Sequence, residues 1–447
     1  MKTLFAVLGS LLLPLCLCAQ QNWKAVMRYD KQDAKTKLAE HLSEYVTYDT
    51  QASSQTDQIP STKGQLSFAK ALAKELKRIG AQNVQTSKQG VVTAEIPATT
   101  AKPTPVIALM ASLDTAETLS GKDIKPQTHE KYRGGDIVID KENNLRLSEY
   151  NSPQLLQARG HDIMTASVST LLGAESKAGI AIIMTLADYL LGNPSIEHGR
   201  IKIVFSPDST THRGIAALDI PALGADYAYS VAGANTGEII TENFSGRCFT
   251  AVFHGKRDVP AGQAMQADFA DNLLMASDFH TLLPRQRRPE NTSARRGFIL
   301  VDSINTVADT STVTGIIRAF NDEEMQELSN LVQQSFTTAK SLNPKNKGAE
   351  LTFQDQFKNA QAFIPASVIQ TLENAMRQED IQPKQIALRG RNDATFLSAH
   401  QLPTVNVFAG TFNPASQLEY ADIDVMEASL RTLISTAVNW TGQNKDQ

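Results

Sequence analysis

A continuous apolar run at residues 105–110 restricts the fold of this 447-residue chain more than any other feature. Its side chains do not alternate between apolar and polar, so we expect a strand buried on both faces of a sheet. Further strands are predicted at residues 91–96, 201–205 and 404–408, and helices at 34–47, 66–79, 178–191 and 425–440. Strands that alternate with helices in this way predict an α/β sheet covered by helices on both faces. Thr62 and Gln65 have the spacing of a capping box before the second helix.

The pattern changes between about residues 243 and 356. Two segments alternate like half-buried strands, and Asn321 is placed to cap a helix with Glu324 at its third position. This span is long enough for a small independent unit. We therefore predict an α+β lid domain at residues 244–356 that interrupts an α/β domain made of residues 22–243 and 357–447.

The first residues have the layout of a secretory signal peptide, with Lys2 followed by an apolar stretch from residue 4 to 18. The stretch is shorter than the roughly 20 residues that span a bilayer. We predict a signal peptide at residues 1–19, and hence an exported protein, periplasmic or secreted. Lipidation of Cys16 or Cys18 is the alternative. Cleavage after Ala19 leaves Cys248 as the sole cysteine, so no internal disulfide is expected.

The charge balance argues against a nucleic-acid partner. Lys and Arg number 43 against 47 Asp and Glu, and the formal net charge is −4. Binding to phosphates needs a concentrated basic face. The one basic cluster, Arg285 to Arg288 with Arg295 and Arg296, is interpreted as a solvated loop.

Several short motifs together resemble one family, and they occur in order from about residue 34 to the C-terminus. They are YDTQ at 48–51, QIPSTKGQ at 58–65, YRGGD at 132–136, LLGAESKAG at 171–179, FSPD at 205–208, LGADYAY at 223–229, ENF at 242–244, IRAF at 317–320 and RGRND at 389–393. The series resembles peptidase T, the tripeptide aminopeptidase branch of the M20 metallopeptidases. The resemblance implies a peptidase-like α/β domain with an inserted lid, through which a homodimer could form.

The family's chemistry, as the resemblance implies it, uses two zinc ions bridged by a carboxylate and a Glu general base. The metal-ligand positions correspond here to Ser112, Glu175, Thr210, Ala232 and, within a residue or two, Leu418. The catalytic positions correspond to Asp114 and Ser209, the second of which would carry the base. Hydroxyl groups bind zinc poorly, so only Glu175 is retained as a ligand. We therefore expect no cofactor and no peptidase activity.

Two hypotheses of function follow. The first is an exported, catalytically inactive protein that keeps a peptide-binding cleft or a scaffolding role, with Arg389 and Asn359 binding the ends of a short peptide by analogy with the family. The alternative is an active tripeptide aminopeptidase that releases N-terminal residues from short peptides. Ser209 and His212 are a weak candidate for nucleophilic catalysis, and a polar loop is favoured there. A hard cation at Asp114, Glu175 and Asp208 stays an open alternative.

Overall fold

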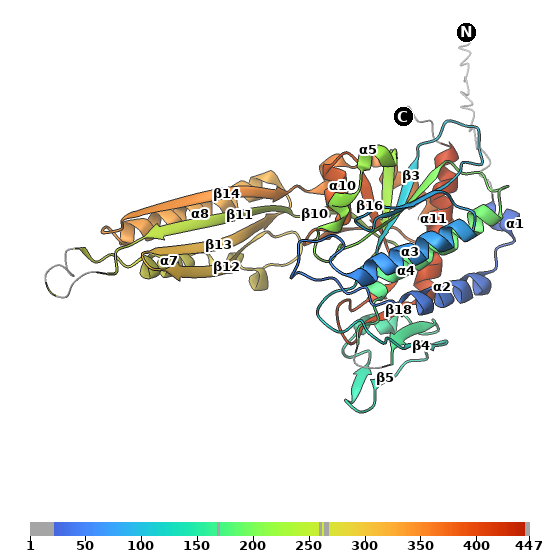
Figure 1. The fold of residues 1–447 in the computed structure, drawn as a ribbon, viewed down its shortest axis with the longest axis horizontal. Coiled ribbons are helices and arrows are strands. Elements are labelled where there is room, and N and C mark those ends of the chain that lie inside the picture. Colours follow the sequence, from blue (N-terminus) through green and yellow to red (C-terminus); the bar gives the residue numbers. More distant parts are fainter. Residues whose placement is uncertain (1–21, 168–169, 259–261, 263–267, 443–447) are drawn as a thin grey trace, which may run out of the picture.

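The computed structural model of the protein describes residues 22–167, 170–258, 262 and 268–442. The predicted signal peptide at residues 1–19 lies outside this part of the chain. None of the helices in the described part is long and apolar enough to cross a membrane. A larger body contains the helices near both ends of the sequence, and an elongated extension projects from it (Figure 1).

The larger body is built on an eight-stranded mixed sheet. In spatial order its strands are β1 (Gln82–Thr86), β2 (Val92–Ile96), β8 (Ile201–Ser206), β3 (Ile107–Ser112), β9 (Tyr227–Val231), β16 (Thr404–Val407), β10 (Glu238–Asn243) and β15 (Lys384–Leu388). The four central strands β8, β3, β9 and β16 are parallel to one another. The α/β fold class predicted from the sequence is confirmed.

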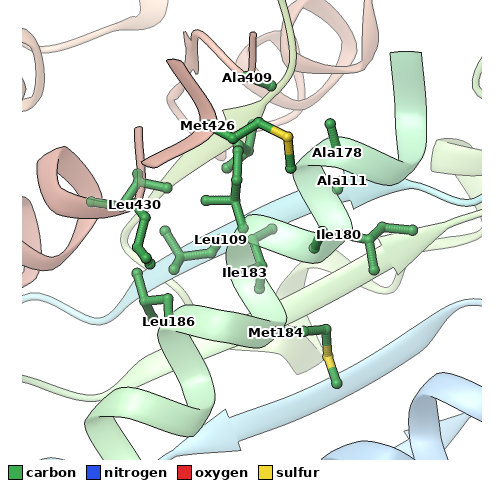
Figure 2. Packing of buried hydrophobic residues seen from close by; sticks show 14 of the residues in the cluster. Leu109, Ala111, Ala178, Ile180, Ile183, Met184, Leu186, Ala409, Met426 and Leu430 are labelled. Atoms are coloured by element: carbon green, nitrogen blue, oxygen red, sulfur yellow. The ribbon is translucent and has the colours of Figure 1, made fainter. Parts of the chain in front are cut away.

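Helices cover both faces of this sheet. On one face lie α2 (Lys31–Tyr45), α3 (Lys63–Arg78), α4 (Ala174–Gly192), α9 (Ala366–Gln378) and α11 (Ile423–Asn439), and on the other lie α5 (Ile220–Leu223) and α10 (Asp393–Ala399). Successive residues of β3 point to opposite faces. Leu109 and Ala111 pack against α4 and α11 (Figure 2), whereas Ala108 and Met110 pack on the opposite side. The predicted burial of this strand on both faces is therefore confirmed.

The extension is a four-stranded antiparallel sheet with two helices against one face (Figure 1). Its elements are β11 (Ser245–His254), α7 (Asn272–Leu282), β12 (Phe298–Val307), β13 (Thr310–Ala319), α8 (Asp322–Leu342) and β14 (Gly348–Phe357). Asn321 caps α8 as predicted, since its side chain accepts a hydrogen bond from the Glu324 amide at 2.8 Å. That residues 244–356 form a separate domain from residues 22–243 and 357–447 stays a prediction.

The remaining elements are short. They are α1 (Trp23–Met27), β4 (Pro126–His129), β5 (Ile137–Asp140), β6 (Leu145–Leu147), β7 (Ile163–Ala166), β17 (Thr411–Phe412), β18 (Tyr420–Asp422) and the 3-10 helices η1 (Pro153–Leu156), η2 (Gly214–Ala217), η3 (Arg285–Arg287), η4 (Pro289–Asn291), η5 (Ala360–Phe363) and η6 (Trp440–Gly442). Strands β17, β18, β7 and β4 form a small sheet that joins residues 126–166 to the segment before α11.

The predicted capping box of α3 is not formed as expected. Thr62 occupies the N-cap position, but its side chain accepts no backbone hydrogen bond there. The Gln65 side chain turns instead to Asp208, donating through Nε2 at 2.8 Å and accepting from the Asp208 amide at 2.9 Å. A buried carboxylate is a stronger acceptor than a neutral hydroxyl, so the tertiary contact replaces the local one.

The close packing of α4 on the sheet can be tested by substituting two of its glycines. A Cβ atom added at Gly179 would lie 2.1 Å from the Val231 carbonyl oxygen, whereas one added at Gly192 of the same helix meets nothing within 4 Å. We expect Gly179→Ala to lower the free energy of unfolding by about 1–3 kcal/mol through overpacking. Gly192→Ala should raise it by about 0.5–1 kcal/mol, because alanine favours the helix. Urea unfolding of both variants measures the difference, and equal effects would contradict this packing.

Candidate functional site

A cavity of about 340 Å³ opens at the edge of the central sheet where β3, β8, β9 and β16 end. The carboxyl ends of parallel strands meet there, which is where open α/β sheets place their ligands. Predicted positions that line it are Ser112, Glu175, Ser209, Thr210 and Ala232, and further lining residues include Ser206, His212, Arg391, Asp393 and Asn406. The structure therefore brings together most of the residues that the family resemblance indicated.

Asp114 lies directly behind this cavity and is fully buried. Its Oδ1 accepts from the Ser209 amide at 2.8 Å, and its Oδ2 accepts from the Thr210 amide at 2.9 Å and the Thr210 hydroxyl at 2.6 Å. Burial raises the pKa of Asp114 despite these hydrogen bonds. The carboxylate thus fixes the loop after β8, and neither oxygen is left for a ligand in the cavity.

Glu175 stands in the first turn of α4, and its carboxyl group lines the cavity. Among the described residues, nothing donates a hydrogen bond to it. Beneath it, the buried Glu419 accepts three backbone hydrogen bonds, from Leu172 at 3.0 Å and from Gly173 and Glu175 at 2.8 Å. Burial, with the negative charges of Glu419 and Asp114, raises the pKa of Glu175 to about 7.

Asp393 is a second carboxyl group on the cavity, at the first position of α10. Its Oδ1 is buried and has no hydrogen-bond partner among the described residues, and its Oδ2 lies 3.4 Å from the Ser206 hydroxyl. Burial, with the negative charge of Asp114, raises the pKa of Asp393 to about 6. The sequence analysis missed this residue, although it closes the RGRND motif just before a helix.

Two carboxyl groups that titrate near neutrality are suited to proton transfer, and perturbed pKa values of this kind concentrate at functional sites. The same carboxylates could bind a cation. Oxygen donors suit magnesium, manganese or calcium better than zinc, and His212 is the one imidazole that lines the cavity in the described part of the chain. The donor types present are therefore those that a hard divalent cation prefers, but no three side-chain ligands among the described residues of the cavity lie close enough together to hold one ion.

The sequence left open a hard cation bound by Asp114, Glu175 and Asp208, and the structure does not bring these three carboxylates together on the cavity. Asp208 is buried away from the cavity, where it accepts from the Ser61 amide at 2.7 Å, from Gln65 and from the Ser61 hydroxyl. Asp114 is fully engaged by the loop after β8. Of the three predicted residues, Glu175 is the one that lines the cavity, and Asp393 is a further carboxyl group there.

A second group of possible metal ligands lies where β18 meets α11. His161, Asp422 and Asp424 offer ligand atoms within 4.8 Å of one another, and no other such group of three is found in the described residues. His161 Nδ1 is 2.8 Å from Asp422 Oδ2, and this contact is the main cause that raises the pKa of His161. Lys35 Nζ lies 2.8 Å from Asp424. A metal ion there would compete with the Lys35 ammonium.

Leu418 does not lie on the cavity. It packs against the apolar cluster that contains Tyr132, Leu147 and Tyr420, and the neighbouring Glu419 is the residue directed toward α4. The correspondence of Leu418 to a ligand position of the family stays a prediction.

Arg389 and Asn359 lie at the junction between the central sheet and the extension. Arg389 donates through Nη1 to the carbonyl oxygens of Ala294 and Arg296, both at 2.9 Å, and through Nη2 to the Thr292 hydroxyl. Asn359 donates to the Phe320 carbonyl at 2.8 Å. Neither lines the cavity, and their binding of a peptide stays a prediction.

Comparison with known sequences finds close relatives over nearly their full length. Peptidase T of Listeria welshimeri is 37% identical over 407 residues, which cover 90% of this chain and 98% of that protein. Peptidase T of Caldanaerobacter subterraneus is 35% identical over 403 residues, covering 89% and 97%. No model of a protein family matches the chain.

Solved structures share the fold. The aminopeptidase PepT from Bacillus cereus superposes with a TM-score of 0.69 at 17% identity, covering 91% of this chain and 98% of that one. A tripeptidase from Staphylococcus aureus gives a TM-score of 0.69 at 16% identity, with 92% and 99% covered. A dinuclear metal-binding peptidase of the M20 family from Bacillus subtilis gives 0.63 at 14% identity, with 93% and 100% covered.

These findings correct three predictions. The prediction of a catalytically inactive protein is wrong, because relatives matched almost end to end are named as peptidases and the cavity keeps carboxyl groups suited to proton transfer. The prediction of no metal cofactor is wrong, because an M20 structural neighbour is described as dinuclear metal-binding and the chain has a possible metal-binding triad. The prediction of export is also corrected, because the likeness to peptidase T gives it no support.

The environment of Glu175 generates a pH-dependent prediction. Its pKa of about 7 in the folded state exceeds the value of about 4.3 expected in the unfolded chain. Ionisation of Glu175 therefore lowers the free energy of unfolding. This loss of stability is absent below the pKa of the unfolded chain and complete above the pKa of the folded state. With a chelator present, Glu175→Gln should be more stable than the wild type by about 1–3 kcal/mol at pH 8 and equally stable near pH 4.5.

Glu117→Gln is the matched control for this titration. The Ser54 amide lowers the pKa of Glu117, so its loss should not stabilise the protein at pH 8. Thermal unfolding across the pH range measures both variants. A Glu175→Gln effect that does not change with pH would contradict the assigned environment.

Proposed function

Because the chain belongs to the peptidase T family of the M20 metallopeptidases, we propose that it is an aminopeptidase that releases N-terminal residues from short peptides, tripeptides first among them. The observation that carries the proposal is the identity of 35–37% over 97–98% of relatives named peptidase T. A cavity at the carboxyl edge of the sheet, with two carboxyl groups that titrate near neutrality, supports it.

In this proposal Glu175 transfers a proton and Asp393 binds the peptide. A group with a pKa of about 7 is partly ionised at neutral pH, so Glu175 could accept a proton from the attacking water and return it to the departing amine. Asp393, at about 6, would attract the ammonium group of the peptide. Asp114 holds the Ser209–Thr210 loop that forms the adjoining wall.

The proposed activity includes a divalent cation at the cavity, with Glu175 as the carboxylate that would hold it. Such a cation would supply Lewis-acid polarisation of the peptide carbonyl. Since a carboxylate is an oxygen donor, we propose manganese or magnesium ahead of zinc. The group of His161, Asp422 and Asp424 is the other candidate for a bound metal.

A homodimer through the extension is also proposed. The edge strand β12 exposes Leu300, Ile304 and Val307, with 38%, 41% and 68% of their surface accessible. Leu300 and Val307 lie on one face of this edge and Ile304 on the other, and exposed apolar side chains on an unpaired edge favour association with another chain. Light scattering should give twice the chain mass, and Ile304→Lys with Val307→Lys should give the monomer; a monomeric wild type would contradict the proposal.

The proposed activity is tested with trialanine and the purified chain supplied with manganese, magnesium or zinc. We expect release of free alanine, with manganese or magnesium effective. Glu175→Gln should lower kcat by about 100-fold or more, because it removes the proton-transfer group. Asp393→Asn should raise KM, because it removes the charge that attracts the ammonium group of the peptide. Glu117→Gln should keep the wild-type rate.

Thermal unfolding with each metal gives an independent measurement. The cation should raise the midpoint of the wild type and of Glu117→Gln, but not that of Glu175→Gln. No hydrolysis with any of the three metals would contradict the proposed function, and hydrolysis unchanged in Glu175→Gln would contradict the assigned cavity.

A further inference from the structure

His212, in the loop after β8, has a backbone conformation that residues other than glycine rarely adopt. Its φ is 57°, in the left-handed region. A Cβ atom crowds the following carbonyl oxygen there, so glycine is the usual residue. A histidine held in this conformation lowers the stability of the fold, and residues of this kind cluster at functional sites. The conformation therefore indicates that the side chain of His212 has a function.

Contacts of the loop backbone fix this conformation. The His212 amide donates to the Ser209 carbonyl at 2.9 Å, and the Arg213 amide donates to the Asp208 carbonyl at 3.2 Å. From behind the cavity, Asp114 accepts a hydrogen bond from the Ser209 amide at 2.8 Å. None of these contacts uses the histidine ring. The loop should therefore keep its shape when another side chain stands at position 212.

The imidazole ring of His212 lines the cavity, and the side chain is exposed. Among the described residues, no hydrogen bond, ion pair or stacked ring engages it. An imidazole carries at least one N–H donor whether it is neutral or protonated. The ring therefore presents a free donor to any molecule that fills the cavity.

The other side chains with nitrogen donors on the cavity are engaged elsewhere. Asn392 donates to Oδ1 of Asn406 at 2.9 Å, and Asn406 donates to the Ala232 carbonyl at 3.2 Å. The guanidinium of Arg391 lies over a phenylalanine ring. In the described lining of the cavity, His212 is therefore the nitrogen donor that makes no such contact.

We infer that the imidazole of His212 donates a hydrogen bond to the carbonyl oxygen of the peptide bond that is cut, and so stabilises the negative charge that this oxygen gains when water adds. His212 keeps its proton throughout. The inference rests on the proposed function and adds a catalytic residue to it. Glu175 and His212 line one cavity of about 340 Å³, which is at the small end for ligand cavities, so a short peptide that fills it contacts both.

Three substitutions at position 212 test the role of the ring, with trialanine as the substrate. His212→Ala and His212→Gly should each lower kcat by about 100-fold, the effect of losing one donor to such an oxygen. KM should rise by no more than about 10-fold, because a neutral hydrogen bond to the bound substrate is worth that at most. His212→Asn should retain more activity than His212→Ala, because asparagine keeps an N–H donor and tolerates the left-handed conformation.

Thermal unfolding of the same variants should follow the backbone instead of the ring. Glycine adopts the left-handed conformation without strain and alanine does not, so His212→Gly should unfold about 1–2 °C above His212→Ala. A structural role would make the loss of kcat follow the unfolding midpoint, with the alanine variant less active than the glycine variant. That result would overturn the inference.

Gln401→Gly is the matched control. Gln401 also has a left-handed backbone, with φ of 70°, and it is exposed in the turn after α10, outside the lining of the cavity. The variant relieves the same kind of strain without removing a cavity side chain. It should keep the kcat of the wild type.

Calorimetric binding of trialanine to chelator-treated protein makes the two proposals fail separately. His212→Ala should bind the peptide about 2- to 10-fold more weakly than the wild type. That loss without hydrolysis by the wild type would support the His212 contact and contradict the proposed function. Hydrolysis with an unchanged kcat in His212→Ala would support the aminopeptidase and overturn the inference. Equal binding without hydrolysis would overturn both.

Discussion

The buried carboxylate of Glu419 positions the start of α4, the helix that carries Glu175. It is buried at the N-terminus of α4 and accepts hydrogen bonds from the backbone amides of Leu172, Gly173 and Glu175, where the helix dipole favours negative charge. These contacts connect the last part of the chain to the helix that carries Glu175. The buried ammonium of Lys177 lies nearby and donates to the Tyr48 carbonyl at 2.7 Å. Burial lowers the pKa of Lys177 to about 7, and the charge of Glu419 acts in the opposite direction.

Local pattern was enough to predict the elements of the core. The apolar run that forms β3, the cap at Asn321 and the helices α4 and α11 follow from periodicity and neighbouring residues alone. The capping box at Thr62 did not form, because Asp208 is a partner 143 residues away that the local sequence cannot reveal. Local rules therefore hold where a residue's contacts lie within its own helix or strand.

The residues of the cavity could be predicted from the sequence only where the spacing of the family motifs identified the corresponding positions. Ser112, Glu175 and Thr210 converge on one cavity because parallel strands end together. The last position does not lie on the cavity: Leu418 packs in an apolar cluster, and its neighbour Glu419 binds the start of α4. Asp393 and Arg391 were overlooked because only the tertiary structure shows that α10 and the loop before it face the cavity.

The junction between the central sheet and the extension has a mechanical consequence. Arg389 fastens the loop at residues 292–296 to the end of β15, and Asn359 joins the segment after β14 to the Phe320 carbonyl after β13. The extension is elongated and leaves the central sheet near these hydrogen bonds (Figure 1). Arg389 and Arg391 lie in the same short loop before α10, and Arg391 lines the cavity. Any rotation of the extension about this junction would therefore also move the wall of the cavity.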